Sequence, residues 1–285
     1  MQIMPLMTTM IFTTTAMAGV TPEVGIAIEL VGSGLLDAHV EEVETNRTIR
    51  LVAVMPTGWR LDAVAGNSEQ ALLLQCNNGT FYQQTFGGPT STSMNSAFVS
   101  FFPELEFDSF VTIGALDQDG APYSANNMND IGFDWTDFEG SGGAITGDNG
   151  TWFVTPSDDQ GEQFAFTDAC GKARTGVTIA QLTLLGDGAT ISFSGLLQGK
   201  DDLGDPWQAF FTVFETTADD RSPADISDSC SGDLDGDDVV NVNDLLSMLS
   251  NWSGNRCLVD LTLDDVVDTA DVIELITQWG ACPTE

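Results

Sequence analysis

The sequence predicts a multi-domain protein in which an all-β sandwich body, with a jelly-roll-like arrangement, is followed by a small all-α module. Three observations predict this fold class. Short β-prone runs alternate with turn signals from residue 24 to residue 215, which is typical of a sandwich or barrel. Residues 216–229 are polar and lack apolar periodicity, so they are expected to form a linker. Beyond the linker, two segments repeat with a period of 27 residues, which predicts a duplicated module over residues 230–285.

The first segment, residues 1–18, is apolar and rich in threonine, and it predicts an export signal. Ala16-Met17-Ala18 precedes Gly19 with the small-x-small form of a cleavage site. No Lys or Arg precedes Arg47, which departs from the usual charged leader, and the alternative is that the segment forms the first strand of the fold. With export, the body covers residues 19–215, and the protein is secreted or held at the cell surface, outside the cytoplasm.

Charge limits the partners that this chain can have. Eight basic residues stand against 43 acidic ones, and the formal net charge is −35. A field of that sign repels nucleic-acid phosphates and anionic lipid surfaces alike, so no nucleic-acid partner is expected. Apart from residues 1–18, no stretch approaches the roughly 18 to 20 apolar residues that a membrane-spanning helix requires, so no membrane span is expected.

Five cysteines are distributed between the body and the module, and no two of them form a CxxC pair. In an exported protein they predict disulfides, with one thiol left over. One bridge in each part is the simplest arrangement, and the connectivity stays open. The body holds Cys76 and Cys170, and the module holds Cys230, Cys257 and Cys282.

The β-prone runs of the body are separated by dipeptides that accept positive φ and favour tight reversals. The predicted strands cover residues 49–54, 80–86, 109–116, 151–155, 177–185, 189–197 and 207–215. The turn dipeptides are Asn78-Gly79, Asp119-Gly120, Asn149-Gly150 and Asp187-Gly188. Asp187-Gly188 lies between two predicted strands, so residues 177–197 are the clearest predicted hairpin. Residues 35–43 and 128–138 are the two stretches that could be helical, although neither has a strong 3.6-residue apolar repeat.

The body offers little for catalysis by histidine or by basic groups. The one histidine, His39, lies in a charged stretch and is expected on the surface, which argues against catalytic triads and His-ligated zinc. A lyase that cleaves polyanions usually needs a basic residue or a tyrosine to transfer a proton. The body offers only Lys172, Lys200, Tyr82 and Tyr123 for this role. A glycosidase needs only two carboxylates at a suitable separation. The candidate carboxylates lie near Trp135 and are Asp134, Asp137 and Glu139. Acidic residues of an ordinary hydrated loop explain the same run equally well.

The alternative to catalysis is a body that binds a glycan or another surface protein. Loops that carry Trp59, Trp135, Trp152 or Trp207 would stack on a sugar ring if these side chains were exposed. Large aromatic residues of a sandwich more often belong to the core, which is the first interpretation of these tryptophans. The body itself is predicted to be noncatalytic. Residues 116–120 and 155–161 are compatible with a further structural calcium ion and with ordinary turns alike.

The repeat runs through the whole of each module unit. The matched pairs are Cys230 and Cys257, Asp233 and Asp260, Asp237 and Asp264, Asn241 and Asp268, Asp244 and Asp271, and Trp252 and Trp279. In the first copy, oxygen-bearing side chains stand at positions 1, 3, 5, 9 and 12 of a 12-residue loop that begins at Asp233. A loop with that spacing can wrap a Ca²⁺ ion with those side chains and with the backbone carbonyl of position 7.

Each loop runs directly into an amphipathic segment with apolar residues at helical spacing. These residues are Leu245, Leu246, Met248 and Leu249 in the first copy, and Val272, Ile273, Leu275 and Ile276 in the second. Each apolar face must be buried, and the other copy is the expected partner. We expect Trp252 and Trp279 to seal this small core. We also expect the two loops to pair in a short strand contact through position 8, which is Val240 or Val267.

The duplicated loop and helix, with Asp at position 12 and no helix before the loop, resembles a type I dockerin over residues 232–280. The resemblance implies two EF-hand-like calcium sites, an all-helical fold with internal twofold symmetry, and docking of an extracellular protein onto a receptor domain called a cohesin. The implied ligands of the first site are Asp233, Asp235, Asp237, the Val239 carbonyl, Asn241 through water, and Asp244. Those of the second site are Asp260, Thr262, Asp264, the Val266 carbonyl, Asp268 and Asp271.

Three departures from the family pattern bear on the sites and on the partner. Position 6, usually glycine, is Asp238 or Asp265, and Asp adopts the required left-handed turn at some cost. The second loop has Thr262 at position 3 and Leu263 at position 4, which predicts that it is the weaker site. Dockerins often recognise their cohesin with a Ser-Thr pair at loop positions 10 and 11. In this chain those positions hold Val242-Asn243 and Thr269-Ala270.

These features predict an exported, noncatalytic protein whose calcium-dependent dockerin-like module attaches a β-sandwich body to a cell-surface or extracellular assembly. The expected partners are a cohesin-like receptor domain or another cell-surface protein, with a glycan as a further candidate. The alternative is a polysaccharide-degrading glycoside hydrolase, or a carbohydrate-binding protein, that carries such a module.

Overall fold

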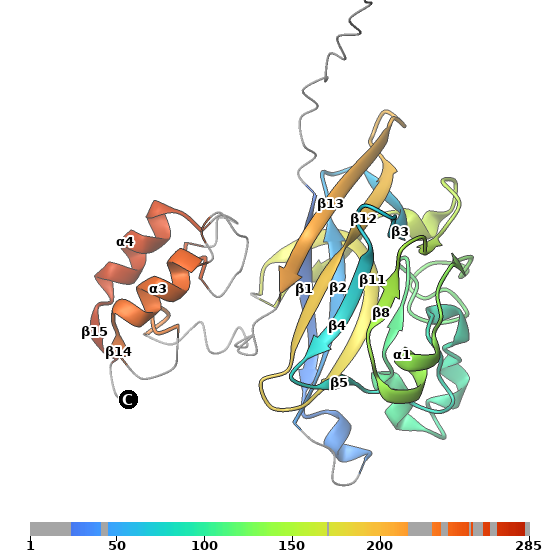
Figure 1. The fold of residues 1–285 in the computed structure, drawn as a ribbon, viewed down its shortest axis with the longest axis horizontal. Coiled ribbons are helices and arrows are strands. Elements are labelled where there is room, and N and C mark those ends of the chain that lie inside the picture. The colour runs from blue at the N-terminus through green and yellow to red at the C-terminus, as the bar shows by residue number, and fades with distance from the viewer. Residues whose placement is uncertain are drawn as a thin grey trace, which may run out of the picture.

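The structure of the chain is a computed structural model. It describes residues 24–40, 45–169, 171–215, 230–234, 239–250, 252, 259–262 and 267–282. The predicted export signal and the predicted linker therefore lie outside the described residues. Figure 1 shows the strands of the body and the two helices of the module, which we describe separately.

One sheet of the body is built around a long central strand, β11 (Ala173–Leu185). Its other members are β1 (Gly25–Ser33), β2 (Asn46–Val54), β5 (Thr80–Phe81), β6 (Phe110–Val111) and β10 (Phe164–Thr167). The order is β1-β2-β11-β10, and β5 and β6 also pair with β11. All of these pairings are antiparallel, with Leu182 of β11 opposite Ile49 of β2.

The second sheet is built around β12 (Thr190–Lys200). Its other members are β3 (Arg60–Ala65), β4 (Leu72–Asn77), β7 (Asn129–Ile131), β8 (Ile145–Gly147), β9 (Thr151–Phe153) and β13 (Pro206–Glu215). The order is β7-β9-β3-β12-β4-β8, with β13 also paired to β12. β3 and β4 pair with successive halves of β12, whereas β13 pairs along most of its length.

The two sheets share one hydrophobic core, to which both contribute fully buried side chains. Leu51 and Ile179 come from the first sheet, and Trp152 and Phe193 come from the second. The indole Nε1 of Trp152 donates to the carbonyl of Thr112 at 3.0 Å, so its one polar group is satisfied inside the core. The all-β class predicted for the body is confirmed, while the jelly-roll-like strand order stays a prediction.

The hairpin predicted over residues 177–197 is wrong. β11 and β12 are consecutive strands, but they belong to different sheets and are not paired with each other. The turn between them places Gly186 at φ 121° and Gly188 at φ 67°, so the reversal itself is present. Each strand instead occupies a central position in its own sheet, where both of its edges are hydrogen-bonded. A turn dipeptide signals a reversal, but it does not specify the sheet that the chain enters next.

Two long strands and two helices predicted in the body are shorter in the structure. Of residues 80–86 and 109–116, only β5 and β6 form strands. After β5, the carboxylate of Asp108 accepts the backbone N–H groups of Gln84 at 2.7 Å and Gly88 at 3.2 Å. Within residues 35–40 and 128–138, the helical elements are a 3-10 turn at Leu36–Ala38 and the start of α1 (Thr136–Ser141). Further 3-10 turns lie at Ser91–Ser93, Ser96–Phe98, Pro103–Phe107 and Asp159–Gly161.

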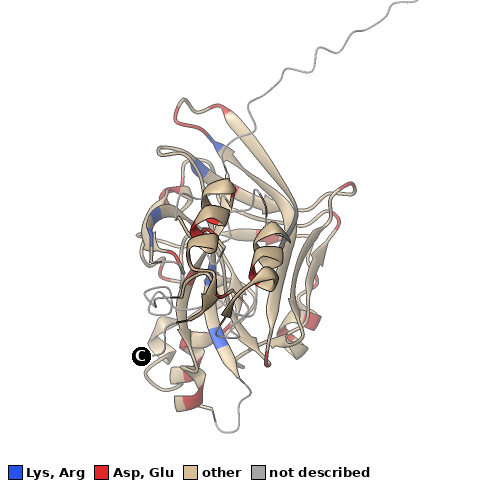
Figure 2. Cartoon of the chain, turned by 90° about the vertical axis from the view of Figure 1, so that its left-hand side faces the viewer, with Lys and Arg blue, Asp and Glu red and all other residues tan. Residues whose placement is uncertain are grey.

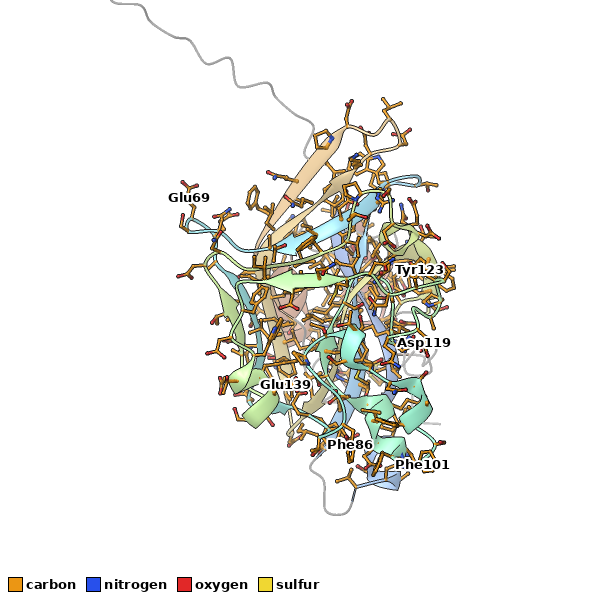
Figure 3. All side chains as sticks on the ribbon, turned by 90° about the vertical axis from the view of Figure 1, so that its right-hand side faces the viewer. Glu69, Phe86, Phe101, Asp119, Tyr123 and Glu139 are labelled. Carbon is orange, nitrogen blue, oxygen red and sulfur yellow. A yellow bond between two sulfur atoms is a disulfide. The ribbon has the colours of Figure 1, made fainter. Side chains whose placement is uncertain are left out.

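Two acidic groups of the body lie near each other in a poorly solvated region. Burial raises the pKa of Asp108 to about 7; the N–H groups of Gln84 and Gly88 oppose this shift, and the charge of Glu139 adds to it. Burial also raises the pKa of Glu139, on α1, to about 7. Glu139 lies toward the same end of the body as Phe86 (Figure 3). Both carboxyl groups in the folded body therefore bind protons at a higher pH than an ordinary carboxyl group does.

Acidic residues are spread over the whole described chain, with few basic ones among them (Figure 2). Several arginines of the body are in ion pairs, such as Arg50 with Glu29 at 3.1 Å and Arg60 with Asp62 at 2.7 Å. His39 is exposed, as predicted, and stacks on Phe107. Within the described ranges, no helix has the length and apolar character needed to cross a membrane.

In the described residues of the module, two helices, α3 (Val242–Ser250) and α4 (Thr269–Thr277), lie at the places expected for the two copies. Two short strands, β14 (Val239–Val240) and β15 (Gly280–Ala281), form an antiparallel pair. The core of the module consists of Val240, Met248, Val259, Val267 and Leu275, all buried. Both copies contribute to this core, so each one covers an apolar face of the other.

Three expectations for the module are wrong. Trp252 and Trp279 do not seal the core, because each remains about half exposed. Only part of each predicted apolar face points inward: Leu246 and Leu249 on α3, and Ile273 and Ile276 on α4, are exposed. The strand contact of Val240 is with Gly280, near the C-terminal end, rather than with the second loop.

The cysteines agree with the simplest predicted arrangement in the module and differ from it in the body. Cys230 and Cys282 form a disulfide, with their Cα atoms 5.5 Å apart. Cys76 is a free thiol, so the body does not contain the bridge between Cys76 and Cys170. Cys170 and Cys257 lie outside the described residues.

Candidate metal centre

The last aspartate of each loop, Asp244 or Asp271, organises the loop through hydrogen bonds from the backbone. Asp244 Oδ1 accepts the N–H of Leu234 at 2.6 Å, and its Oδ2 accepts the N–H of Asn241 at 2.7 Å. Asp271 Oδ1 accepts the N–H of Thr262 at 3.0 Å, and its Oδ2 accepts the N–H of Asp268 at 2.8 Å. In both copies, this carboxylate therefore joins the beginning of the loop to the start of the helix that follows.

The start of each helix is capped in the same way at positions 27 residues apart. The Asn243 N–H donates to Asn241 Oδ1 at 2.8 Å, and the Ala270 N–H donates to Asp268 Oδ1 at 2.6 Å. Together with the bonds to the last loop aspartates, these contacts give each helix a reciprocal capping box, which satisfies N–H groups left free at a helix N-terminus. The sequence repeat is therefore also a repeat of hydrogen bonds.

Four aspartates of the two loops are buried. They occupy positions 1 and 12 of each copy, are at most 6% exposed, and are Asp233, Asp244, Asp260 and Asp271. Burial alone would raise the pKa of Asp271, but the N–H groups of Asp268 and Thr262 and the Thr262 hydroxyl outweigh it and hold the pKa below its usual range. Asp271 is therefore ionised in the fold.

Little positive charge is available in the module to compensate these carboxylates. Residues 230–285 contain twelve Asp and Glu residues and a single basic residue, Arg256. Burying a charge is costly unless an opposite charge accompanies it. A hard cation, which prefers oxygen ligands, fits a donor set of carboxylates, an amide oxygen, a hydroxyl and backbone carbonyls. The residues present thus fit a calcium ion in each loop.

The structure describes eight of the twelve predicted ligand residues. In the first loop these are Asp233, Val239, Asn241 and Asp244, and in the second they are Asp260, Thr262, Asp268 and Asp271. Asp235, Asp237, Asp264 and Val266 lie outside the described residues. In the second loop, the Thr262 hydroxyl donates to Asp271 Oδ1 at 3.1 Å and to Asp260 Oδ1 at 3.4 Å, so three predicted ligands of that site are in direct contact.

One contact at the first loop could not be predicted from the sequence. Asp233 lies against the disulfide, and its Oδ2 is 3.8 Å from Cys282 Sγ. Cys230, Asp233 and Cys282 also bring their donor atoms within 4.8 Å of one another. Both sulfur atoms are already bonded to each other, so the group is a disulfide beside a carboxylate rather than a thiolate metal site. The cysteines of an exported protein predicted bridges but not their places.

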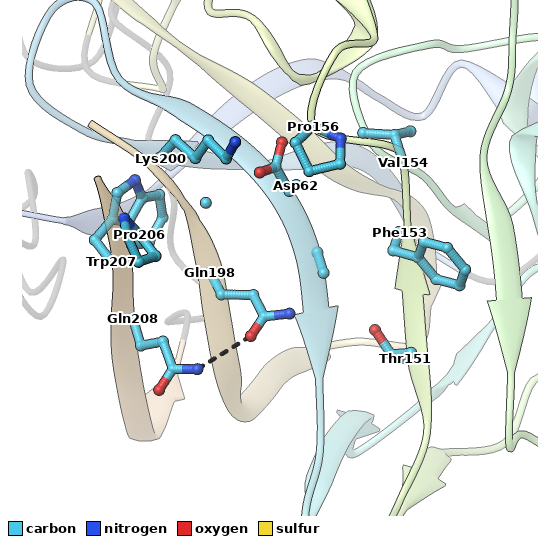
Figure 4. Close-up of a pocket in the computed structure, with 12 residues that line it drawn as sticks. Asp62, Thr151, Phe153, Val154, Pro156, Gln198, Lys200, Pro206, Trp207 and Gln208 are labelled. Carbon is cyan, nitrogen blue, oxygen red and sulfur yellow. Dashed lines mark hydrogen bonds between the residues drawn. The ribbon is translucent and has the colours of Figure 1, made fainter. Parts of the chain in front are cut away.

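A pocket of about 800 Å³ lies over β3, β9, β12 and β13 of the body (Figure 4). Its polar side chains bond largely to the protein: Gln208 Nε2 donates to Gln198 Oε1 at 3.2 Å, and Asp62 accepts from Arg60. Asp62 is the one carboxylate among the lining residues. The pocket therefore does not present the two facing carboxylates that a glycosidase requires.

A second pocket, of about 460 Å³, is lined by Asp134 and Asp137, two of the acids singled out in the sequence. Hydrogen bonds from the side chain and backbone of Thr136 lower the pKa of Asp134, whereas the acid of a glycosidase needs a raised pKa. Asp137 Oδ1 accepts the hydroxyl of Ser141 at 2.8 Å. Glu139, whose pKa is raised, does not line this pocket. The run thus does not assemble an acid–nucleophile pair.

The four tryptophans of the body are packed against the core, as the first interpretation expected. Trp152 and Trp207 are buried, and Trp59 and Trp135 are half-buried. Trp59 stacks on Trp207 with ring centroids 5.7 Å apart, and Trp135 Nε1 donates to Asp130 at 3.1 Å. None of the four offers a fully exposed ring face to a sugar.

The first loop is expected to bind calcium about tenfold more tightly than the second, which corresponds to roughly 1.4 kcal/mol. The second loop carries a neutral hydroxyl, Thr262, where the first carries Asp235, and ligand type and backbone flexibility both set the affinity of such loops. Calorimetry on Asp233→Ala and Asp260→Ala would report the surviving site in each variant. Equal affinities, or a tighter surviving site in Asp233→Ala, would contradict this ranking.

No protein-family model matches the sequence, and no curated protein matches it. The resemblance to dockerins therefore depends on the repeat, on its loops and on their oxygen-bearing residues.

Proposed function

We propose that residues 230–285 form a calcium-dependent docking module of the dockerin type, which attaches the β body to a cell-surface or extracellular assembly outside the cytoplasm. One observation carries the calcium part of this proposal. Four aspartates are buried at matching positions of two loops, in a segment that contains a single basic residue. A cation in each loop compensates their charge.

The calcium ions have a structural role in this proposal. Each ion supplies positive charge to its loop and couples the loop to the helix that follows through Asp244 or Asp271. The chain itself holds these carboxylates in place with backbone N–H groups on both sides of the loop. The ligands of the first site are Asp233, Asp235, Asp237, Val239, Asn241 and Asp244, and those of the second are Asp260, Thr262, Asp264, Val266, Asp268 and Asp271.

Exposed apolar residues on both helices support the docking part of the proposal. They stand at equivalent places in the two copies and are between 43% and 64% exposed: Leu246 and Ile273, Leu249 and Ile276, and Trp252 and Trp279. In each copy, the first two residues lie three apart on the helix and the tryptophan lies just beyond its end, and these exposed side chains are called the apolar stripe of that copy. Clustered exposed apolar side chains are typical of protein interaction sites. The stripes fit the apolar face of a receptor domain such as a cohesin or another surface protein.

The body is proposed to be the noncatalytic cargo of this module. The two pockets described above lack a suitable pair of carboxylates, and the tryptophans of the body are packed against its core. The alternative, a polysaccharide-degrading or carbohydrate-binding body with a possible glycan ligand, is not favoured by any specific contact in the described residues.

The test is binding of the full chain to isolated cell envelopes of the producing organism, in calcium and in excess chelator. Chelator is expected to abolish binding, and the double variant Leu246→Asp/Ile273→Asp is expected to weaken it by at least about tenfold, because a buried charge opposes apolar docking. Phe101→Asp, on an exposed residue of the body, is the matched control and should bind normally. Binding that neither chelator nor the stripe variant changes would refute the proposal.

A further inference from the structure

The disulfide between Cys230 and Cys282 joins the beginning of the first copy to the end of the second, 52 residues away. It lies directly against the first ligand residue of the first loop. The N–H of Asp233 donates to the carbonyl of Cys230 at 3.1 Å, and its Oδ2 is 3.8 Å from Cys282 Sγ. The second of these is a van der Waals contact, because a disulfide sulfur carries no proton. Asp233 is therefore held from both halves of the bridge.

The segment before Cys282 contacts the first loop at two further places. Gly280 and Ala281 pair with Val240 and Val239, which are positions 8 and 7 of that loop. Position 7 is the residue whose carbonyl is the predicted ligand. Gln278 Oε1 accepts the N–H of Gly232 at 2.8 Å, immediately before Asp233. Residues 278–282 thus contact the first loop at its beginning, beside Asp233, and at positions 7 and 8.

The sequence does not repeat this bridge in the second copy. The residue equivalent to Cys230 is Cys257, but the residue 27 positions before Cys282 is Asn255. A second bridge with the same pair of positions, 27 residues earlier, is therefore not possible. The disulfide breaks the symmetry of the repeat, and its contacts fall on the first loop.

We propose that the Cys230–Cys282 disulfide is a positioning element for the first cation site, which raises the affinity of that site and leaves the second site unchanged. This inference rests on the calcium function proposed above. Affinity in such loops depends on how rigidly the ligands are held. A loop that is ordered before the ion arrives loses less conformational freedom on binding. The bridge restrains Asp233 directly, and it restrains Val239 through the strand pair β14 and β15.

The experiment measures calcium affinity by calorimetry on the full chain with one site active at a time. Asp260→Ala isolates the first site, and Asp233→Ala isolates the second. The pair Cys230→Ser/Cys282→Ser is then added to each. Loss of the bridge is expected to weaken the first site by about tenfold and to change the second by less than about twofold. Leu275→Ala, in the core that both copies share, is the matched control and should weaken both sites.

A second variant tests the same idea with the bridge intact. Gln278→Ala removes the hydrogen bond to Gly232 and is expected to weaken the first site by about threefold, again without affecting the second. Helical circular dichroism in saturating calcium shows whether the chain without the bridge folds. If it does not fold, the Gln278→Ala variant alone tests the inference. Equal losses at both sites, or an unchanged first site, would overturn the inference. A native chain that binds no calcium would instead overturn the proposed function, and this inference with it.

Discussion

Removal of calcium is expected to abolish the helical circular-dichroism signal of the module while the β signal of the body persists. Without a cation, four buried carboxylates, two in each loop, lie in a segment with one basic residue. A ligand at 100 times its Kd stabilises the folded state by about 2.7 kcal/mol per site. Two sites therefore supply about 5 kcal/mol, comparable with the whole stability of a small domain. The disulfide restricts the unfolded chain, but it does not compensate these charges.

The control for this prediction is a module that needs no cation. Asp233→Asn combined with Asp260→Asn keeps the shape of both side chains, removes two buried charges and leaves the backbone hydrogen bonds of Asp244 and Asp271 in place, so its helicity should respond much less to chelator. Calcium added back to the native chain should restore the signal. Helicity of the native module that survives excess chelator unchanged would show that calcium does not have this role.

The body is expected to be less stable at pH 8 than at pH 5. Burial raises the pKa of Asp108 to about 7 in the folded state, with a further contribution from the charge of Glu139. Between its unfolded pKa and about pH 7, the folded body binds more protons than the unfolded chain, so the free energy of unfolding falls as the pH rises through this window. Asp108 accounts for about 3 kcal/mol of this change. Glu139 adds a smaller part because it is only half-buried.

Urea unfolding in saturating calcium at pH 5 and pH 8 would measure this difference. Asp108→Asn should remove most of the pH dependence, while Asp119→Asn, on an exposed loop, should leave it intact. Repulsion among the acidic surface groups also grows with pH, but salt screens it, whereas burial of Asp108 is insensitive to salt. The comparison is therefore made at high ionic strength. An unchanged slope in Asp108→Asn would contradict the prediction.

The sequence predicted the class of the body well and its strand pairing poorly. Alternating residues and turn dipeptides are local signals, and they placed β2, β9, β11, β12 and β13 close to their observed positions. Pairing depends on contacts between distant residues, such as Leu182 with Ile49, which no local pattern contains. The loop after β5 also depends on a distant residue, because the side chain of Asp108, 20 residues or more away, accepts the N–H groups of Gln84 and Gly88.

In the module, the repeat predicted where each helix follows its loop, because the apolar spacing of each copy is a local signal. It did not predict which side of each helix faces the core. Leu245 and Leu246 are adjacent, so apolar residues surround much of α3 and helical spacing alone allows either to point inward. The structure buries Met248 and leaves Leu246 exposed. The partner of Cys230 was equally undetermined, since three cysteines of the module allowed several bridges.

The state of Cys76 has a consequence for how the disulfide of the chain forms. Burial raises the pKa of this thiol to about 11, against the opposing influence of Arg47. At neutral pH, about one such thiol in ten thousand is a thiolate, the form that attacks disulfides. Cys76 therefore reacts slowly once the body has folded. If the body folds before the module, the Cys76 thiol therefore takes little part in thiol–disulfide exchange while the disulfide between Cys230 and Cys282 forms.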